Sequence, residues 1–455
     1  IYYIKLLKGL GEFMEKDKFQ TGRFERLSYG GFFLGQNIIY VIPFQFLAYF
    51  YLEYVGLKLE DVTLMLLIAK VWDAVNDPIM GAIVDKCNFK KGKYLPWLKI
   101  VTYLLPLSLV LMFINPDASY TIKLIYAYAT YILYDMIYTI SDSPLFSLST
   151  VMSSLPYERD MLMSYGRLAA AVAAILSAVF MSIKVKADWT LTVVIYCFAA
   201  FLFMFPLQFK AKERVEYTRS KDITFKEIFK YLFKNKYLLI YYLGYLAIGS
   251  TNSLQIMAAI FANSNLGSDT MVTIIMGVTI LPIIIIAPFL PKLISKFGKK
   301  KITVFCSIAT IVMCVIQYVT GYSNIVIFLI ISAIRVVFMQ APLMLYGMFT
   351  ADCIEYGAYI NGERTEAIAF SLQTFVTKLS AALCQTLCLA LLSVSGYVEK
   401  APTQSARSLH GIWIIMTLLP IVGYAIMIII MGIYKLDEKK VEEMLEHNKR
   451  REINA

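Results

Sequence analysis

The chain has 455 residues, of which 59% are hydrophobic and 16% are charged, and its mean hydropathy is +0.64. Soluble globular proteins have about 45–50% apolar and about 25% charged residues, so this composition excludes an ordinary soluble fold. The apolar residues form long, nearly continuous runs, such as 193–209 and 412–434, and do not alternate as they do in barrel strands. The sequence therefore predicts an all-α, polytopic membrane protein.

The formal net charge of +11 would favour nucleic-acid binding in a soluble protein, but here the basic residues fall into particular loops. Basic clusters at 5–26, 86–93, 210–236, 292–301 and 435–451 alternate with short connections that carry few basic residues. This positive-inside pattern predicts that both termini are cytoplasmic and that no nucleic acid is bound. We expect a multi-pass protein of the cell inner (plasma) membrane that contacts membrane lipids and functions as a monomer.

Twelve transmembrane helices are predicted in chain order. They cover about 27–54, 62–85, 96–115, 122–148, 163–184, 189–209, 237–262, 270–291, 302–321, 325–349, 366–395 and 409–434. The predicted domains are a cytoplasmic N-terminal segment (1–26), a six-helix bundle (27–209), a cytoplasmic linker (210–236), a second six-helix bundle (237–434) and a cytoplasmic tail (435–455). Two six-helix halves joined by such a linker are typical of the major facilitator superfamily fold.

The loops after the second and the eighth predicted spans carry glycines and lysines at matching places. The first loop contains Gly81, Asp85, Lys86, Lys90, Gly92 and Lys93, and the second contains Lys292, Lys296, Gly298, Lys299 and Lys300. The pattern suggests the superfamily's cytoplasmic loop signature. A general basic bias of cytoplasmic loops explains it equally well.

Two acidic residues lie deep in the second predicted span. Asp73 and Asp77 follow Asp61, at the outer end of this span, by about 18–24 Å at 1.5 Å per residue. A charge near the bilayer centre costs several kcal/mol unless it faces a polar cavity or a partner. The i, i+4 spacing places both carboxylates on one face, where protonation or a bound cation relieves their repulsion. With Asn76 beside them, they predict a site for Na⁺, Li⁺ or H⁺; a structural network tied to Lys70 or to another helix is the alternative.

A second polar group lies in the fourth predicted span. Thr139 and Asp142 are i, i+3 neighbours that can share a ligand with the second span, and Tyr138 precedes them. Arg167 in the fifth span and Lys378 in the eleventh can balance these acids or bind a polar substrate. Snorkelling of the charged group to the inner surface is the alternative, mainly for Arg167.

Several segments resemble one known family. The segments 70–81 (KVWDAVNDPIMG) and 92–97 (GKYLPW) closely resemble the second helix and the following loop of the melibiose permease type, and the likeness continues through 138–144, 157–160, 351–357, 362–366 and 370–374. These matches span both halves in the right order. The chain therefore resembles the glycoside–pentoside–hexuronide:cation symporter family, and the resemblance implies cation-coupled transport of a sugar or glycoside by alternating access.

The resemblance implies roles residue by residue. It assigns the cation site to Asp73, Asp77, Asn76, Thr139 and Asp142. It assigns substrate contacts to Tyr138, Asp142, Arg167, Gln373, Thr374 and Lys378. It assigns gating contacts, which hold the two halves together in outward-facing states, to Arg159, Asp352, Glu355, Arg364 and Glu366.

The chain departs from the melibiose permease pattern at three substrate positions. Asn37 stands at a substrate-binding aspartate, Gln36 at a neighbouring lysine, and Phe146 at the stacking tryptophan. An amide can both donate and accept, whereas an ionised carboxylate only accepts. These changes disfavour an α-galactoside. Because Arg167 and Lys378 are retained, a hexuronide or glucuronide becomes a candidate substrate beside a neutral glycoside or pentoside.

Two rival functions stay open beside symport coupled to Na⁺ or H⁺. One is cation-coupled transport of a lysolipid or another amphiphile, and the other is a membrane sensor that binds a sugar without translocating it. No nucleophile–base pair or phosphate-binding loop appears in the sequence, so we predict no enzyme activity, catalytic residue, resident metal or cofactor. The expected partners are a sugar or glycoside and the coupling cation. Arg335, in the tenth predicted span, has no role that the sequence predicts.

Overall fold

The computed structural model describes residues 19–87, 89, 92–214, 234–286, 289–361 and 366–454. Apart from an isolated bridge between Phe89 and Gly92, no β-pairing occurs among these residues, which form helices joined by short turns. The chain divides into two compact units, Ile1–Ser220 and Lys221–Ala455. The division falls within the predicted linker, of which residues 215–233 lie outside the described residues, so the linker and domain limits stay predictions.

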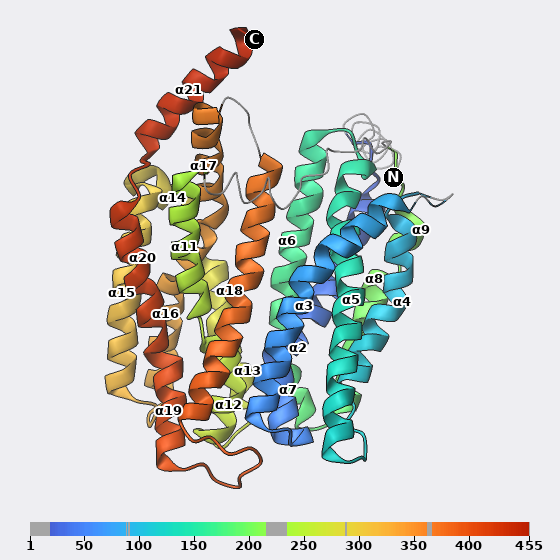
Figure 1. Ribbon diagram of the computed structural model, residues 1–455, viewed down its shortest axis with the longest axis vertical. Coiled ribbons are helices and arrows are strands. Elements are labelled where there is room, and N and C mark those ends of the chain that lie inside the picture. Colours follow the sequence, from blue (N-terminus) through green and yellow to red (C-terminus); the bar gives the residue numbers. More distant parts are fainter. Residues whose placement is uncertain are drawn as a thin grey trace, which may run out of the picture. The chain divides into compact units, whose positions relative to one another are not determined.

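The N-terminal unit is a bundle built around α2, which packs on α6 and α8 (Figure 1). Helix α5 packs on both α3 and α4, and α4 also packs on α8. The elements of this unit are α2 (Arg23–Tyr49), the π-helical segment η1 (Phe50–Val55), α3 (Leu59–Lys86), α4 (Leu95–Met112), α5 (Tyr120–Met152), α6 (Pro156–Ala178), α7 (Phe180–Lys184), α8 (Trp189–Met204) and α9 (Leu207–Lys210).

In the C-terminal unit, α11 packs on α18 and α20, α15 packs on α16 and α20, and α21 packs on α17. Its elements are α11 (Lys236–Ser250), α12 (Leu254–Ser264), α13 (Met271–Ile286), α14 (Leu290–Phe297), α15 (Lys299–Thr320), α16 (Ile325–Met344), α17 (Tyr346–Asn361), α18 (Glu366–Val394), α19 (Ala406–Thr417), α20 (Leu419–Ile433) and α21 (Glu438–Asn454). Side-chain oxygens of Asn235, Asn324 and Ser405 accept backbone N–H groups at the starts of α11, α16 and α19, which fixes where these helices begin.

Nine helical segments among the described residues are long and apolar enough to cross a membrane. Helices α3 and α5 are interrupted by polar and charged residues and α13 is shorter, and these three are not among the nine. With them, the described part of each unit holds six spans in chain order, and the predicted all-α polytopic fold is confirmed. Several helices differ from the prediction. The helix expected at 325–349 continues as α17 to Asn361. The spans expected at 163–184, 237–262 and 409–434 are broken at Val179, at Thr251 and at Leu418, the last just before Pro420.

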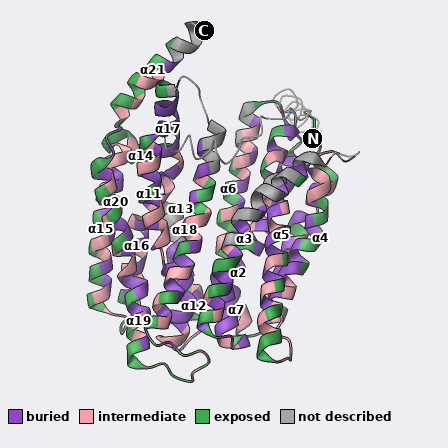
Figure 2. Cartoon of the chain, in the orientation of Figure 1, coloured by how far each residue is buried: buried purple, intermediate pink, exposed green. Residues whose placement is uncertain are grey.

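Helix α15 buries its polar residues and exposes its apolar ones. Thr303, Thr310 and Gln317 are fully buried, whereas Phe305 and Val319 are 64% and 78% exposed. Figure 2 shows exposed positions recurring along this helix. A helix in water would present the opposite faces to its surroundings. The exposed face of α15 in the C-terminal unit is therefore suited to an apolar solvent.

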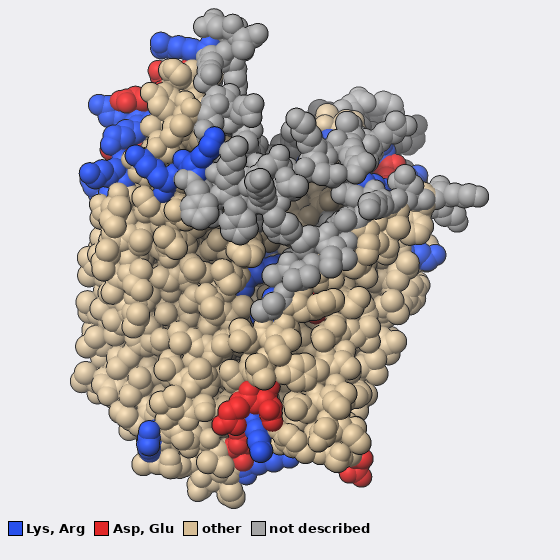
Figure 3. Space-filling view, viewed as in Figure 1, with Lys and Arg blue, Asp and Glu red and all other residues tan. Residues whose placement is uncertain are grey.

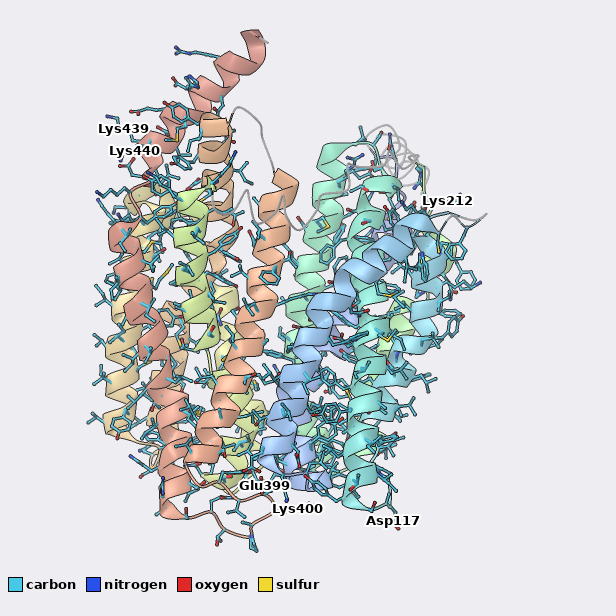
Figure 4. All side chains as sticks on the ribbon, in the orientation of Figure 1. Asp117, Lys212, Glu399, Lys400, Lys439 and Lys440 are labelled. Atoms are coloured by element: carbon cyan, nitrogen blue, oxygen red, sulfur yellow. The ribbon has the colours of Figure 1, made fainter. Side chains whose placement is uncertain are left out.

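Charged side chains gather at the ends of the helices in each unit. In the C-terminal unit, basic residues cluster beside the start of α21, while the surface along the helices below them is largely uncharged (Figure 3). Lys439 and Lys440 lie at this end, and Glu399 and Lys400 lie at the opposite one (Figure 4). In the N-terminal unit, Lys212 and Asp117 lie at opposite ends (Figure 4). An uncharged band between charged ends is the surface expected of a membrane-spanning bundle.

Each unit caps one of its helices with a carboxylate supplied from after its last span. Glu213 accepts hydrogen bonds of 2.7–2.8 Å from three successive backbone N–H groups at the start of α4. Glu438 accepts a hydrogen bond from the backbone N–H of Lys299 at the start of α15. Each carboxylate lies against a glycine with positive φ: Gly92 at 113° and Gly298 at 83°. The two loops with matching sequence thus share one construction, which favours an internal repeat over a general basic bias.

Gly92→Ala and Gly298→Ala test this construction. An added Cβ would lie 2.8 Å from the Glu213 carboxylate or 2.9 Å from that of Glu438, and both positions have a φ that L side chains rarely adopt. We expect each variant to lose about 1–3 kcal/mol of stability and to show a lowered melting temperature in detergent. Gly432→Ala is the matched control, because nothing lies within 4 Å of its added Cβ and α20 is helical there. If both variants melt at the same temperature as Gly432→Ala, these glycines are not needed to make room for the capping carboxylates.

A buried carboxylate joins the segment before α2 to the start of α6. Glu158 accepts hydrogen bonds from the backbone N–H groups of Thr21, at 2.8 Å, and Gln20, at 3.1 Å, and from the hydroxyls of Thr21 and Ser153. Arg26 lies 3.8 Å from the same carboxylate. Burial raises the pKa of Glu158, but the hydrogen bonds from Ser153, Thr21 and Gln20 outweigh burial, so the pKa of this carboxyl is lowered overall.

This lowered pKa makes the contribution of Glu158 depend on pH. A carboxylate whose pKa falls on folding stabilises the protein above its ordinary pKa of 4.5, and this stabilisation is lost as the pH falls through the lowered value. We expect Glu158→Gln to lower the melting temperature at pH 7, and the gap from wild type to narrow as the pH falls below 4.5. Glu443→Gln, at an exposed position of α21, serves as control. If the difference in melting temperature between wild type and Glu158→Gln stays constant down to pH 4, the charge of Glu158 does not stabilise the protein.

Candidate functional site

Two buried amide side chains join α5 to α3 and α2. Asn76 of α3 donates through Nδ2 to Thr139 Oγ1 of α5 at 3.0 Å. Gln36 of α2 donates through Nε2 to Ser141 Oγ at 2.8 Å and to Asp142 Oδ1 at 3.3 Å. A buried amide in an apolar bundle has to find its hydrogen-bond partners within the protein. These bonds therefore fix which turns of the three helices face one another.

The predicted cation-site residues of α3 and α5 meet at this level. Asp73 is 8% exposed and lies three residues before Asn76, so the two side chains share one face of α3. Tyr138 lies near both Asp73 and Asp142, one carboxylate from each helix. Thr139 is buried beside them. Carboxylate, amide and hydroxyl oxygens gathered in this way suit a hard cation. Asp77 lies in α3, but its side chain is outside the described residues.

Aromatic rings surround Tyr138 within the N-terminal unit. Its ring centroid lies 5.3 Å from that of Tyr40 and 6.1 Å from that of Tyr134, the second pair being stacked. Tyr138 is half-buried, so the ring beside the two carboxylates is not sealed in the core. An aromatic face next to hydrogen-bonding acids and amides is the combination that binds a sugar ring and its hydroxyls.

Three other predicted substrate residues of this unit lie outside the buried amide network. Asn37 is half-buried, and its Nδ2 donates to the carbonyl of Phe33 in the same helix at 2.8 Å. Phe146 is 44% exposed and packs edge-on against Phe33, with centroids 5.2 Å apart. Arg167 is exposed on α6. The structure thus draws Gln36 into contact with Asp142 but leaves Asn37, Phe146 and Arg167 apart from that contact.

The remaining predicted substrate residues belong to the C-terminal unit, on α18. Gln373 is half-buried and its backbone carbonyl accepts a 3.1 Å hydrogen bond from the hydroxyl of Tyr346. Its side-chain Oε1 is buried and has no hydrogen-bond donor among the described residues. Thr374 is exposed and Lys378 is half-buried on the same helix. Each unit therefore carries its own part of the predicted substrate site.

Two predicted gating acids have partners within the C-terminal unit. Asp352 of α17 forms an ion pair with Lys299 at the start of α15. Glu355, one turn further along α17, accepts a hydrogen bond of 3.1 Å from the side-chain amide of Asn448 in α21. Both acids are buried on α17, which packs on α21.

The other predicted gating residues are placed less completely. Arg159 of α6 donates through Nε to the carbonyl of Ser153 at 2.7 Å, within the N-terminal unit. Arg364 lies outside the described residues. Glu366 begins α18, but its side chain is outside the described residues.

Sequence reasoning missed one acid of this site. Asp135 lies on α5, four residues before Thr139, and is 6% exposed. Lys70 of α3 interacts electrostatically with both Asp135 and Asp73. The signal was present in the sequence, because Asp135 interrupts an apolar span just as Asp73 does.

Arg335 has a structural role that the sequence did not predict. It is fully buried in α16, and its Nη1 donates to the carbonyl of Met416 at 3.2 Å. In an unbroken helix this carbonyl would accept the N–H of residue 420, but Pro420 has none. The guanidinium therefore supplies a donor at the break between α19 and α20.

Comparison with known proteins agrees with this architecture. The family described as MFS/sugar transport protein matches residues 28–438. The chain is 29% identical to "Uncharacterized symporter YjmB" of Bacillus subtilis over 93% of this chain and 94% of the relative. It is 26% identical to "Isoprimeverose transporter" of Lactiplantibacillus pentosus, over 91% and 89%, and 24% identical to "Glucuronide carrier protein homolog" of Escherichia coli, over 91% and 93%.

Solved structures show the same fold. The crystal structure of the nucleoside transporter NupG superposes with a TM-score of 0.63 at 9% sequence identity, covering 90% of this chain and 99% of that one. The predicted likeness to glycoside, pentoside and hexuronide cation symporters is confirmed, and the molecule is a multi-pass membrane transporter and not an enzyme. The chain belongs to the MFS/sugar transport protein family.

Proposed function

We propose that this protein uses the inward movement of a cation to drive uptake of a sugar or glycoside by alternating access. The observation that carries the proposal is the buried contact of α3 with α5. There, the hydrogen bond from Asn76 to Thr139 lies beside Asp73, within a bundle that is otherwise apolar. Acids inside a membrane bundle mark ion pathways by default. Relatives named as symporters, an isoprimeverose transporter and a glucuronide carrier homolog point to the same chemistry.

The coupling ion in this proposal is Na⁺, Li⁺ or H⁺. Its ligands are Asp73, Asp77, Asn76, Thr139 and Asp142. Asp142 also accepts a hydrogen bond from Gln36, a proposed substrate residue, so one carboxylate serves both ligands. A cation that neutralises charge around Asp142 changes how this carboxylate holds the substrate. By linkage, each ligand then raises the affinity for the other by the same factor.

The proposed substrate is a sugar whose ring lies against Tyr138. Other contacts in the proposal are Asn37, Gln36, Asp142, Phe146, Arg167, Gln373, Thr374 and Lys378. The Gln373 Oε1 atom supports this, since a substrate hydroxyl would provide the donor that this buried acceptor does not find among the described residues. With the cations Arg167 and Lys378 on this list, we propose a hexuronide or glucuronide ahead of a neutral glycoside.

The proposed setting is the inner (plasma) membrane, with both termini in the cytoplasm and one chain as the working unit in contact with lipids. The basic residues at the α21 end of the C-terminal unit support this orientation. In this setting Arg159, Asp352, Glu355, Arg364 and Glu366 act as cytoplasmic gating contacts. The ion pair of Asp352 with Lys299 lies within the C-terminal unit and holds the Asp352 carboxylate in place there.

Asp73→Asn tests the proposal in proteoliposomes. We expect the variant to lose cation-stimulated accumulation by at least about tenfold, because removing one charged ligand costs the cation more than about 1.4 kcal/mol. Uptake of a panel of glycosides and glucuronides is measured with and without Na⁺ and with a pH gradient. Asp117→Asn, at an exposed loop position, is the matched control and should transport as wild type does. Undiminished accumulation by Asp73→Asn would refute cation coupling at this site.

Asp142→Asn separates a shared carboxylate from a purely structural one. We expect this variant to raise both the KM for the sugar and the cation concentration for half-maximal uptake, since Asp142 serves both ligands in the proposal. Initial rates at varied sugar and cation give both constants. An increase in only one of them would contradict the shared role. If vesicles with wild-type protein transport a lysolipid but none of the sugars, the substrate is an amphiphile and not a sugar.

A further inference from the structure

The register between α3 and α5 places three charged groups on adjacent turns. The hydrogen bond from Asn76 to Thr139 brings these two residues to one level. Successive spans alternate in direction, so α3 and α5 run the same way. One turn towards the start of each helix from that level lie Asp73, at i−3, and Asp135, at i−4. Lys70 lies one further turn along α3, and the N-terminal tilt of helical side chains directs a residue towards the preceding turn.

The three groups interact inside the bundle. Lys70 lies near the carboxylates of Asp73 and Asp135 and interacts with both electrostatically, and Tyr131 lies near all three. Asp73, Asp135 and Tyr131 are buried. In such surroundings charge–charge interactions are several times stronger than in water. A lysine has a flexible four-carbon stem and three donors, so one ammonium can serve either carboxylate.

The charges of these three groups allow Lys70 a choice of partner. Two carboxylates and one ammonium leave a net charge of −1 among Lys70, Asp73 and Asp135, so Asp73 keeps its charge for the coupling cation whenever Lys70 lies on Asp135. Without Asp135, the ammonium of Lys70 would lie on Asp73 alone. The coupling cation would then meet a competitor on one of its carboxylate ligands.

We propose that Lys70 is a tethered cation which shares Asp73 with the coupling cation and moves onto Asp135 when that cation binds. Asp135 is then a residue that sets cation affinity without being a cation ligand itself. The inference rests on the proposed function, since it concerns the affinity for the ion that drives uptake. It assigns roles to two residues outside the cation-site set of Asp73, Asp77, Asn76, Thr139 and Asp142.

Three variants test the charge arrangement. Asp135→Asn leaves Lys70 on Asp73, and we expect the cation concentration for half-maximal uptake to rise at least about tenfold. Lys70→Met removes the competitor, and the same constant should fall at least about threefold. In the double variant the net charge is again −1 and no ammonium competes for Asp73. The cation concentration for half-maximal uptake should therefore return to within about threefold of wild type. Initial uptake rates at saturating sugar and varied Na⁺ or pH give these constants.

The outcomes separate this inference from the proposed function. Wild-type uptake that does not respond to any cation would refute cation coupling itself. If a cation drives wild-type uptake but Asp135→Asn leaves the cation concentration for half-maximal uptake unchanged, only the role of Lys70 and Asp135 is overturned. The same holds if the double variant does not bring this concentration back towards wild type. If Asp135→Asn does not fold, Lys70→Met decides alone, because an unchanged or raised constant contradicts displacement. Asp135→Glu keeps the charge and should stay within about threefold of wild type.

Discussion

Inside an apolar bundle, a polar side chain finds no water to hydrogen-bond, so other protein groups have to provide its hydrogen-bond partners. This constraint organises the N-terminal unit. Asn76 finds Thr139 across α3 and α5, and Gln36 finds Ser141 and Asp142 across α2 and α5. Because these bonds fix the facing turns, they also decide where the carboxylates come to lie. The arrangement of acids that the proposed transport needs follows from the pairing of amides.

Both units provide acceptors for backbone N–H groups at the start of a helix in the same way. A carboxylate that follows the last span of the unit, Glu213 or Glu438, reaches back to exposed N–H groups at the start of α4 or α15. The neighbouring glycines make room for it, with φ values that favour glycine. Such caps fix each unit from within. Internal rigidity is what a rocking-bundle cycle requires, because its two halves move as bodies around the bound ligands.

Much of the fold and part of the site could be predicted from the sequence for one physical reason. Crossing a membrane demands about 20 apolar residues, so an acid such as Asp73 within such a run is conspicuous. Asp135 obeys the same rule, but it lies outside the segments that resemble the family and has no acidic neighbour at i±3 or i±4. The partners of the side chains were harder to predict. That Asn37 bonds its own helix while Gln36 crosses to α5 depends on helix rotation, which composition does not determine. The break at Leu418, supported by Arg335, depends on a contact 81 residues away.

The central claim is that carboxylates held between α3 and α5 bind the coupling cation. Direct binding to the purified protein tests it without any sugar or membrane gradient. Wild-type protein and Asp73→Asn are titrated by calorimetry with Na⁺ at constant pH, and then with H⁺ in the absence of Na⁺. The account predicts saturable binding of one of these cations to the wild type, and its loss or at least a tenfold weakening in the variant. Binding of unchanged affinity and stoichiometry in Asp73→Asn would contradict it.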